Sequence, residues 1–188
     1  MKQKTALIVG ATGLIGNELL KILLNKSEYK KVIAIVRKPL GFNHSKLEEK
    51  VIDFDRLDES IINFEVDDVF SCLGTTIKKA KSQEVMRKID VTYPLTIARL
   101  TKQMGAKQFL FVSSLSANAQ ASNFYLRIKG ELEEEVSKID FDSVTIFRPS
   151  LLMGKRGEFR IGERTAEVVY KALSVFFIGP LKKFKAIQ

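Results

Sequence analysis

The stretch Thr5–Gly16, TALIVGATGLIG, decides the fold of this chain. Its first five residues, Thr5–Val9, form an apolar run that is typical of a buried strand, and Asn17–Leu24 has a helical pattern. Between the two stand glycines at positions 10, 13 and 16. Glycines in this strand–turn–helix context predict a loop where the backbone approaches a dinucleotide pyrophosphate at a helix N-terminus.

The rest of the chain alternates short apolar runs with helical patterns. Strands are predicted at Thr5–Val9, Val32–Val36, Val51–Phe54, Asp68–Leu73, Phe109–Ser113 and Val144–Phe147, and helices at Asn17–Leu24, Ser82–Met104 and Phe124–Ser137. Continuously apolar strands that alternate with helices are typical of parallel sheets buried on both faces. The pattern predicts an α/β fold, a Rossmann-type doubly wound parallel sheet of six or seven strands with helices on both faces. Residues 1–188 are expected to form a single NAD(P)-binding domain, with 150–188 as a short substrate-side segment.

The ends of the predicted strands supply candidate cofactor-binding residues. Arg37 and Lys38 follow the second strand, where an NAD-specific site usually has an acidic residue for the ribose 2′-hydroxyl. A guanidinium can hold a 2′-phosphate through charge-assisted hydrogen bonds, so NADP(H) is expected over NAD(H); a surface arginine is the alternative. Asp53 could accept a hydrogen bond from the adenine amino group and Gly74 would leave room for the ribose, although both could be ordinary turn residues. The loop and strand-end candidates are Gly10, Thr12, Gly13, Leu14, Ile15, Gly16, Arg37, Lys38, Asp53, Phe54, Cys72, Leu73, Gly74 and Thr75.

Composition excludes several classes of protein. The net charge is +9, but the lysines are scattered and form no face of interleaved aromatic and basic residues, so nucleic-acid binding is not expected. The single cysteine, Cys72, cannot form an intramolecular disulfide, and no signal segment or membrane span is visible, so a cytoplasmic protein is expected. The lone His44 has no Cys or His partners, and no metal site is expected.

A second motif, Tyr125-Leu126-Arg127-Ile128-Lys129, lies at the start of the helix after the fifth strand. The four-residue spacing puts the phenol and the ammonium on one helical face. A nearby ammonium favours the phenolate, so Lys129 would lower the pKa of Tyr125 and make it a better proton donor at neutral pH. The fifth strand ends in Ser113-Ser114. Parallel sheets of this kind bind ligands in a crevice beyond the carboxyl ends of their strands, so one of these hydroxyls would lie in that crevice with Tyr125 and Lys129.

Together, the glycine loop, the serine pair, Tyr125 and Lys129 resemble the short-chain dehydrogenase/reductase superfamily over residues 5 to about 155. More narrowly, the strings CLGTT (72–76), SNFYL (122–126) and KGE (129–131) resemble the Tat-interacting-protein group of atypical, NADPH-binding members. The resemblance implies that Ser114 orients a carbonyl, that Tyr125 is the general acid, and that Lys129 binds the nicotinamide ribose. It also implies that Arg148 and Pro149 lie beneath the nicotinamide. Ser113 remains an alternative to Ser114, because adjacent residues of an extended chain point in opposite directions.

One departure from the superfamily pattern concerns the helix after the fourth strand. Many members place an Asn there to hold a proton-relay water, whereas this chain has Asp90-Val91-Thr92-Tyr93. The expected function is an NADPH-dependent oxidoreductase that reduces a small carbonyl compound by hydride transfer at a Ser-Tyr-Lys site. The alternative is an NADPH-binding sensor or adaptor with little turnover. Substrate specificity would come from the loops Ser116–Asn123 and Leu151–Ile161.

The C-terminal run Ala166–Ile178 is apolar nearly all round and precedes lysines at 182, 183 and 185. At 13 residues it is too short to span a bilayer as a helix. It is expected to pack over the crevice or against a partner subunit, with a homodimer as the candidate assembly. Contact of residues 166–185 with a membrane surface is the less favoured alternative.

Overall fold

The structure is a computed structural model that describes residues 3–58 and 65–150. The contacts within the chain divide it at Pro149, and the sheet and helices belong to the unit Met1–Arg148. The predictions for Leu151–Ile161 and for residues 166–185 lie outside the described residues. In the described part of the chain, no helix has the length and apolar character needed to cross a membrane.

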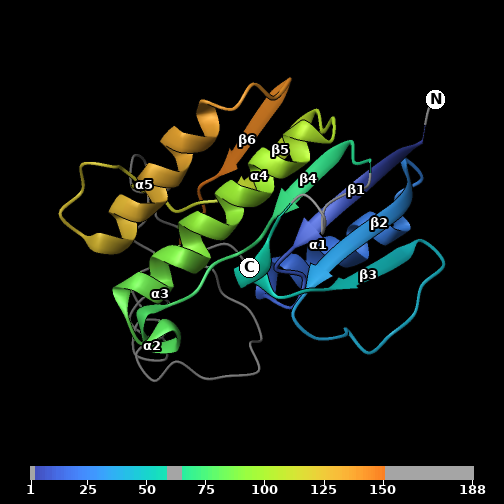
Figure 1. The fold of residues 1–188 in the computed structure, drawn as a ribbon, viewed down its shortest axis with the longest axis horizontal. Coiled ribbons are helices and arrows are strands. Elements are labelled where there is room, and N and C mark those ends of the chain that lie inside the picture. The colour runs from blue at the N-terminus through green and yellow to red at the C-terminus, as the bar shows by residue number, and fades with distance from the viewer. Residues whose placement is uncertain (1–2, 59–64, 151–188) are drawn as a thin grey trace, which may run out of the picture. The chain divides into compact units, whose positions relative to one another are not determined.

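A six-stranded parallel sheet forms the centre of this unit (Figure 1). Its strands are β1 (Lys4–Val9), β2 (Tyr29–Val36), β3 (Leu47–Val51), β4 (Asp68–Ser71), β5 (Gln108–Val112) and β6 (Ser143–Phe147), in the order β3-β2-β1-β4-β5-β6. All five pairings are parallel, which confirms the predicted Rossmann-type sheet. The order reverses between β1 and β4, and sheets of this kind bind ligands beyond the carboxyl ends of the strands at that point.

Helices cover both faces of the sheet, as predicted. They are α1 (Leu14–Asn25), α2 (Ile77–Ala80), α3 (Gln83–Arg87), a π-helical turn η2 (Lys88–Thr92), α4 (Tyr93–Gln103) and α5 (Phe124–Ser137). Side chains along β1 alternate between two cores: Ala6 and Ile8 pack with α1, whereas Leu7 and Val9 pack with α4 and α5. Figure 1 shows α4 and α5 side by side on the face opposite α1. This double burial explains why the central strands are apolar throughout.

The predicted third strand, Val51–Phe54, is wrong in position. The observed strand β3 is Leu47–Val51, whose sequence LEEKV carries charges because it lies at the edge of the sheet. Of the apolar residues that suggested the strand, Val51 ends β3, whereas Ile52 and Phe54 belong to the turn that follows. There Asp53 caps a short 3-10 helix, η1 (Phe54–Arg56), by accepting a 3.0 Å hydrogen bond from the Asp55 N–H.

The predicted helix Ser82–Met104 is present as three consecutive helical segments. Ser82 caps α3 by accepting a hydrogen bond from the Val85 N–H. The π turn η2 separates α3 from α4, and Pro94 stands in the first turn of α4. Proline in a regular helix lacks an N–H and crowds the carbonyl four residues earlier, here that of Asp90, and a wider turn accommodates it. Asp90 lies within this π turn.

Gly130, in the middle of α5, allows the loop after β5 to pack directly on the helix. A Cβ at this position would lie 2.1 Å from the Ala119 nitrogen and 2.3 Å from the Asn118 carbonyl carbon.

Helix propensity alone would make Gly130→Ala stabilising by about 1 kcal/mol. The backbone contact reverses the sign, and we expect Gly130→Ala to destabilise the protein by about 1–3 kcal/mol in urea denaturation. Glu134→Ala, at an exposed position of the same helix, is the control and should change stability by less than about 0.5 kcal/mol. A stabilised Gly130→Ala variant would contradict this packing.

Candidate functional site

The glycine loop packs against the backbone that follows β4. Gly10 has φ +79°, and a Cβ there would lie 2.6 Å from the Cys72 carbonyl carbon. A Cβ on Gly16 would lie 2.1 Å from the Gly10 oxygen. Glycine is therefore required at both positions, at the first by the backbone angle and at both by the close approach. This contact places the loop at the carboxyl ends of β1 and β4, where the strand order reverses.

The N-terminus of α1 fits an anionic group. Gly13 is the N-cap and supplies no side-chain hydrogen bond, and the first turn, which begins with Leu14 and Ile15, contains no acidic residue. First-turn N–H groups have no partner within a helix, and the helix dipole favours negative charge there. Thr12 is exposed beside this turn. The loop thus has the donors that a pyrophosphate needs, and no side chain at Gly13 stands in the way.

Arg37 and Lys38, directly after β2, are both exposed. Asp53 is partly used by its own turn, because Oδ1 accepts from the Asp55 N–H and Oδ2 lies 3.8 Å from Arg56 Nε. Phe54 is buried, and its ring centroid lies 5.4 Å from that of Tyr93.

Tyr93 donates a hydrogen bond to Asp55, and Lys88 Nζ lies 2.7 Å from the same carboxylate. Burial and the Asp55 charge raise the pKa of Tyr93 to about 12, while the nearby Arg37 charge opposes this shift. The Ile52 N–H donates a 2.9 Å hydrogen bond to the Val36 oxygen, so the chain after β3 lies beside the end of β2. The predicted adenosine-side residues therefore gather at the ends of β2 and β3, together with Tyr93 from α4.

The segment Cys72–Thr75 continues β4 toward the same edge. Burial raises the pKa of the Cys72 thiol to about 12, so the thiol stays protonated at neutral pH. The Leu73 side chain packs on the core, whereas Gly74 is exposed. The Thr75 N–H donates a 2.9 Å hydrogen bond to Asp90 Oδ2, which fixes this segment to the π turn.

Lys129 lies at the centre of the predicted site. Its side chain is 3% exposed, and Nζ lies 2.9 Å from Asp90 Oδ1 and 3.3 Å from the Val112 oxygen. The same ammonium is 6.0 Å from the centroid of the Tyr125 ring, which is half-buried at the start of α5. A Cβ built on Gly74 would lie 3.8 Å from Nζ. The structure therefore brings Tyr125, Lys129 and Gly74 together at the carboxyl edge.

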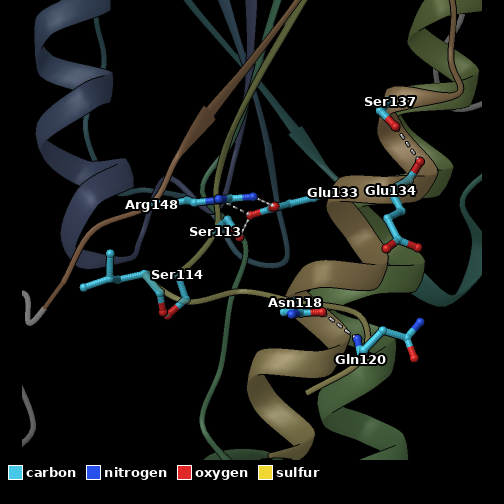
Figure 2. A network of polar contacts seen from close by, with 9 residues as sticks. Ser113, Ser114, Asn118, Gln120, Glu133, Glu134, Ser137 and Arg148 are labelled. Atoms are coloured by element: carbon cyan, nitrogen blue, oxygen red, sulfur yellow. Dashed lines mark hydrogen bonds and ion pairs between the residues drawn. The ribbon is translucent and has the colours of Figure 1, made fainter.

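The two adjacent serines have different partners, as Figure 2 shows. The buried Ser113 hydroxyl donates a hydrogen bond to Glu133 Oε1. Glu133 also binds Arg148 through two hydrogen bonds, one of them 3.0 Å from Nε to Oε1. The Glu133 carboxylate raises the pKa of the Arg148 guanidinium. This network joins the ends of β5 and β6 to α5.

Ser114 is half-buried, and its hydroxyl donates a 3.3 Å hydrogen bond to the Leu115 carbonyl oxygen. The next residue but one, Ser116, has φ +66°, so the chain turns away from the strand direction here. Arg148 lies on Glu133, and Pro149 belongs to the second unit of the chain, so their predicted place beneath a nicotinamide stays a prediction.

Sequence reasoning did not identify the roles of Asp90 and Glu133, two buried carboxylates. Asp90 was considered only as a departure from an expected Asn. The available signal was a charged residue on an apolar helical face, four residues after Met86 and seven before Ile97. For Glu133 the signal was its position four residues after Lys129 in α5.

The amino edge of the sheet also has a hollow, but the predicted site residues do not line it. A hollow of about 220 Å³ lies at the amino ends of β1, β4 and β5, lined by Lys4, Asp67, Asp68, Lys107, Gln108 and Asp142. None of the predicted site residues contributes to it. Over residues 3–58 and 65–150, no group of three or more His, Cys, Asp or Glu side chains could hold a metal ion.

Sequence comparison identifies relatives along most of the chain. Residues 6–174 match the NAD dependent epimerase/dehydratase family. The chain is 38% identical to rat Protein HTATIP2 over 177 residues, which is 92% of this chain and 73% of the relative. It is 34% identical to Protein FMP52, mitochondrial, of Candida albicans over 168 residues, 86% of this chain and 73% of the relative. The first of these confirms the resemblance to the Tat-interacting-protein group.

Solved structures show the same fold. MoeE5 in complex with UDP-glucose and NAD superimposes with a TM-score of 0.66 at 21% identity, covering 80% of this chain and 55% of that protein. The Bordetella bronchiseptica enzyme WbmG in complex with NAD gives 0.68 at 16% identity, covering 93% of this chain and 61% of that protein. This chain therefore spans less than two thirds of the length of these two enzymes.

The comparisons also correct one prediction. The expected cytoplasmic localisation is contradicted, because similar proteins of Candida albicans and Debaryomyces hansenii are named as mitochondrial. Composition failed here because a single cysteine reports only on a reducing environment, which several compartments share. The fold and the sequence match agree on identity: the chain belongs to the NAD dependent epimerase/dehydratase family of short-chain-dehydrogenase-type oxidoreductases.

Proposed function

We propose that the protein is an NADPH-dependent reductase of a small carbonyl compound. The observation that carries this proposal is the position of the Lys129 ammonium, 6.0 Å from the Tyr125 ring centroid and 3.8 Å from a Cβ built on Gly74, at the sheet edge that also holds the glycine loop. A proton donor and a pyrophosphate-binding turn at one edge are the two parts that hydride transfer to a carbonyl requires.

The cofactor would be held along this edge by residues already described. The N–H groups at the start of α1 would bind the pyrophosphate. Arg37 and Lys38 would bind a ribose 2′-phosphate, and Phe54 and Tyr93 would flank the adenosine. A bound reduced nicotinamide supplies the hydride for the carbonyl carbon.

The remaining steps belong to side chains of this chain. Tyr125 would donate its phenolic proton to the carbonyl oxygen as that oxygen gains negative charge. Lys129 would stabilise the phenolate that remains and would hydrogen-bond the nicotinamide ribose. Ser114 would orient the carbonyl oxygen. We assign this role to Ser114 and not to Ser113, because the Ser113 hydroxyl is buried and donates to Glu133.

A second function, cofactor binding without turnover, is favoured by a different observation. The Lys129 ammonium already contacts the Asp90 carboxylate and the Val112 carbonyl oxygen. Its contact with Tyr125 is with the ring, 6.0 Å from the centroid, and not with the phenolic oxygen that would donate the proton. A sensor would need only the cofactor contacts. Acceleration of NADPH oxidation by a carbonyl compound distinguishes the two functions, since only the reductase shows it.

Tyr125→Phe tests the assignment of the proton donor. The change removes one hydroxyl and keeps the ring that packs on the core. We expect kcat to fall by about 100-fold or more, because general acid catalysis contributes about that much, with the NADPH dissociation constant within threefold of wild type. The measurement is NADPH oxidation with a panel of small aldehydes and ketones, together with fluorescence titration of NADPH.

Tyr29→Phe is the matched control for this variant. Tyr29 hydrogen-bonds Asp68 at the amino edge of the sheet, 2.8 Å from Oδ2, and its removal should leave kcat within twofold of wild type. Undiminished turnover by Tyr125→Phe would remove the proposed mechanism.

Arg37→Ala tests the cofactor preference. Loss of a charge-assisted hydrogen bond to the 2′-phosphate should weaken NADPH binding by about 10- to 100-fold and leave NADH binding within twofold. Lys138→Ala, at the exposed end of α5, controls for the lost positive charge and should change neither constant. Equal dissociation constants for NADPH and NADH in the wild-type protein would refute the role of Arg37.

A further inference from the structure

A buried ion pair joins the proposed site to the π turn. Asp90 is 0% exposed, Lys129 is 3% exposed, and Oδ1 and Nζ lie 2.9 Å apart. Aspartate and lysine are seldom buried so completely, because both charges must leave water. Each must therefore have compensating contacts, and these contacts show what the pair connects.

The other oxygen of Asp90 holds the chain after β4. Oδ2 accepts a 2.9 Å hydrogen bond from the Thr75 N–H, and a Cβ on the preceding Gly74 would lie 3.4 Å from Oδ1. Lys129 in turn donates to the Val112 oxygen at the end of β5. The ion pair thus links α5, the end of β5 and the Gly74–Thr75 backbone.

The backbone around Asp90 is not a regular α-helix. Asp90 lies within the π turn Lys88–Thr92, which departs from the regular helical spacing ahead of Pro94. π turns are often found at functional sites because they redirect one side chain without ending the helix. Here the π turn contains a carboxylate, that of Asp90, which meets the Lys129 ammonium.

We propose that Asp90 is a positioning residue that fixes the Lys129 ammonium and the Gly74–Thr75 backbone as one unit against the cofactor. The inference rests on the proposed function, since it assumes that Lys129 binds the nicotinamide ribose. In the stretch where the superfamily pattern has a relay Asn, this chain thus has a charged residue, Asp90, with a different role. Asp90 acts only through Lys129 and the backbone, so its removal should affect cofactor binding by way of the lysine.

A double-mutant cycle on cofactor affinity tests this coupling. The variants are Asp90→Asn, which keeps the shape of the side chain and removes its charge, Lys129→Met, and the double variant. NADPH dissociation constants are measured by fluorescence titration, and circular dichroism confirms that each variant is folded. The double variant removes both charges together, so it leaves neither as an unpaired buried ion.

Asp68→Asn is the matched control. Asp68 is also a buried carboxylate paired with a lysine, 3.0 Å from Lys4 Nζ, but it lies at the amino edge of the sheet. It should lose stability in the same way as Asp90→Asn and keep the NADPH dissociation constant within twofold of wild type. A merely structural role for Asp90 would give the same result.

The expected result is a loss of NADPH affinity of tenfold or more for Asp90→Asn in the wild-type background. In the Lys129→Met background the same substitution should change affinity by less than twofold. Comparison of Lys129→Met with the double variant keeps the test valid if Asp90→Asn alone fails to fold. Equal losses in both backgrounds, or none in either, would overturn the inference. Failure of the wild-type protein to bind NADPH would instead overturn the proposed function and this inference with it.

Discussion

The ion pair between Asp90 and Lys129 is the interaction on which the carboxyl edge of the sheet depends. Removing one member of a buried pair costs about 3–5 kcal/mol, because the other charge is left in a medium that solvates it poorly. Because of this cost, any movement that separates the two charges is unfavourable, and the positions of the elements that contact the pair are restricted. The start of α5, the π turn, the chain after β4 and the end of β5 must keep the positions that satisfy both charges.

A second constraint, made of backbone alone, brings the glycine loop to the same place. Gly10 and the Cys72 carbonyl approach so closely that no side chain fits between them. The two contacts meet in one short segment, Cys72–Thr75, which touches the glycine loop at its beginning and the ion pair at its end. The glycine loop and Lys129 are therefore held to a common piece of chain, which would let residues far apart in sequence serve the proposed reaction.

The sheet was predictable from the sequence because its central strands are buried on both faces and read as apolar runs. The edge strand β3 was misplaced because it is not buried on both faces, so its sequence LEEKV contains no apolar run. The apolar residues Ile52 and Phe54, which follow it, suggested the strand instead. The two local motifs, Gly10 to Gly16 and Tyr125 with Lys129, were singled out by their spacing together with their place directly after predicted strands.

Contacts between distant segments could not be predicted in this way. No pattern in the sequence shows that Asp90 meets Lys129, because their pairing depends on a π turn and on the packing of α5 against η2. The choice between Ser113 and Ser114 likewise depended on Glu133, which lies on another element. The localisation could not be predicted from composition either. Composition suggested a cytoplasmic protein, whereas a similar protein of Candida albicans is named as mitochondrial.

In the proposed function, one edge of the sheet holds both the cofactor and the proton donor. The most direct test is a titration with NADPH followed by the backbone amide resonances of the isotopically labelled protein. We expect the largest shifts on Gly10–Gly16, Gly74–Thr75 and Val112–Ser114, with Lys4, Asp68 and Gln108 at the amino edge unchanged. Shifts confined to the amino edge, or none at saturating NADPH, would contradict it.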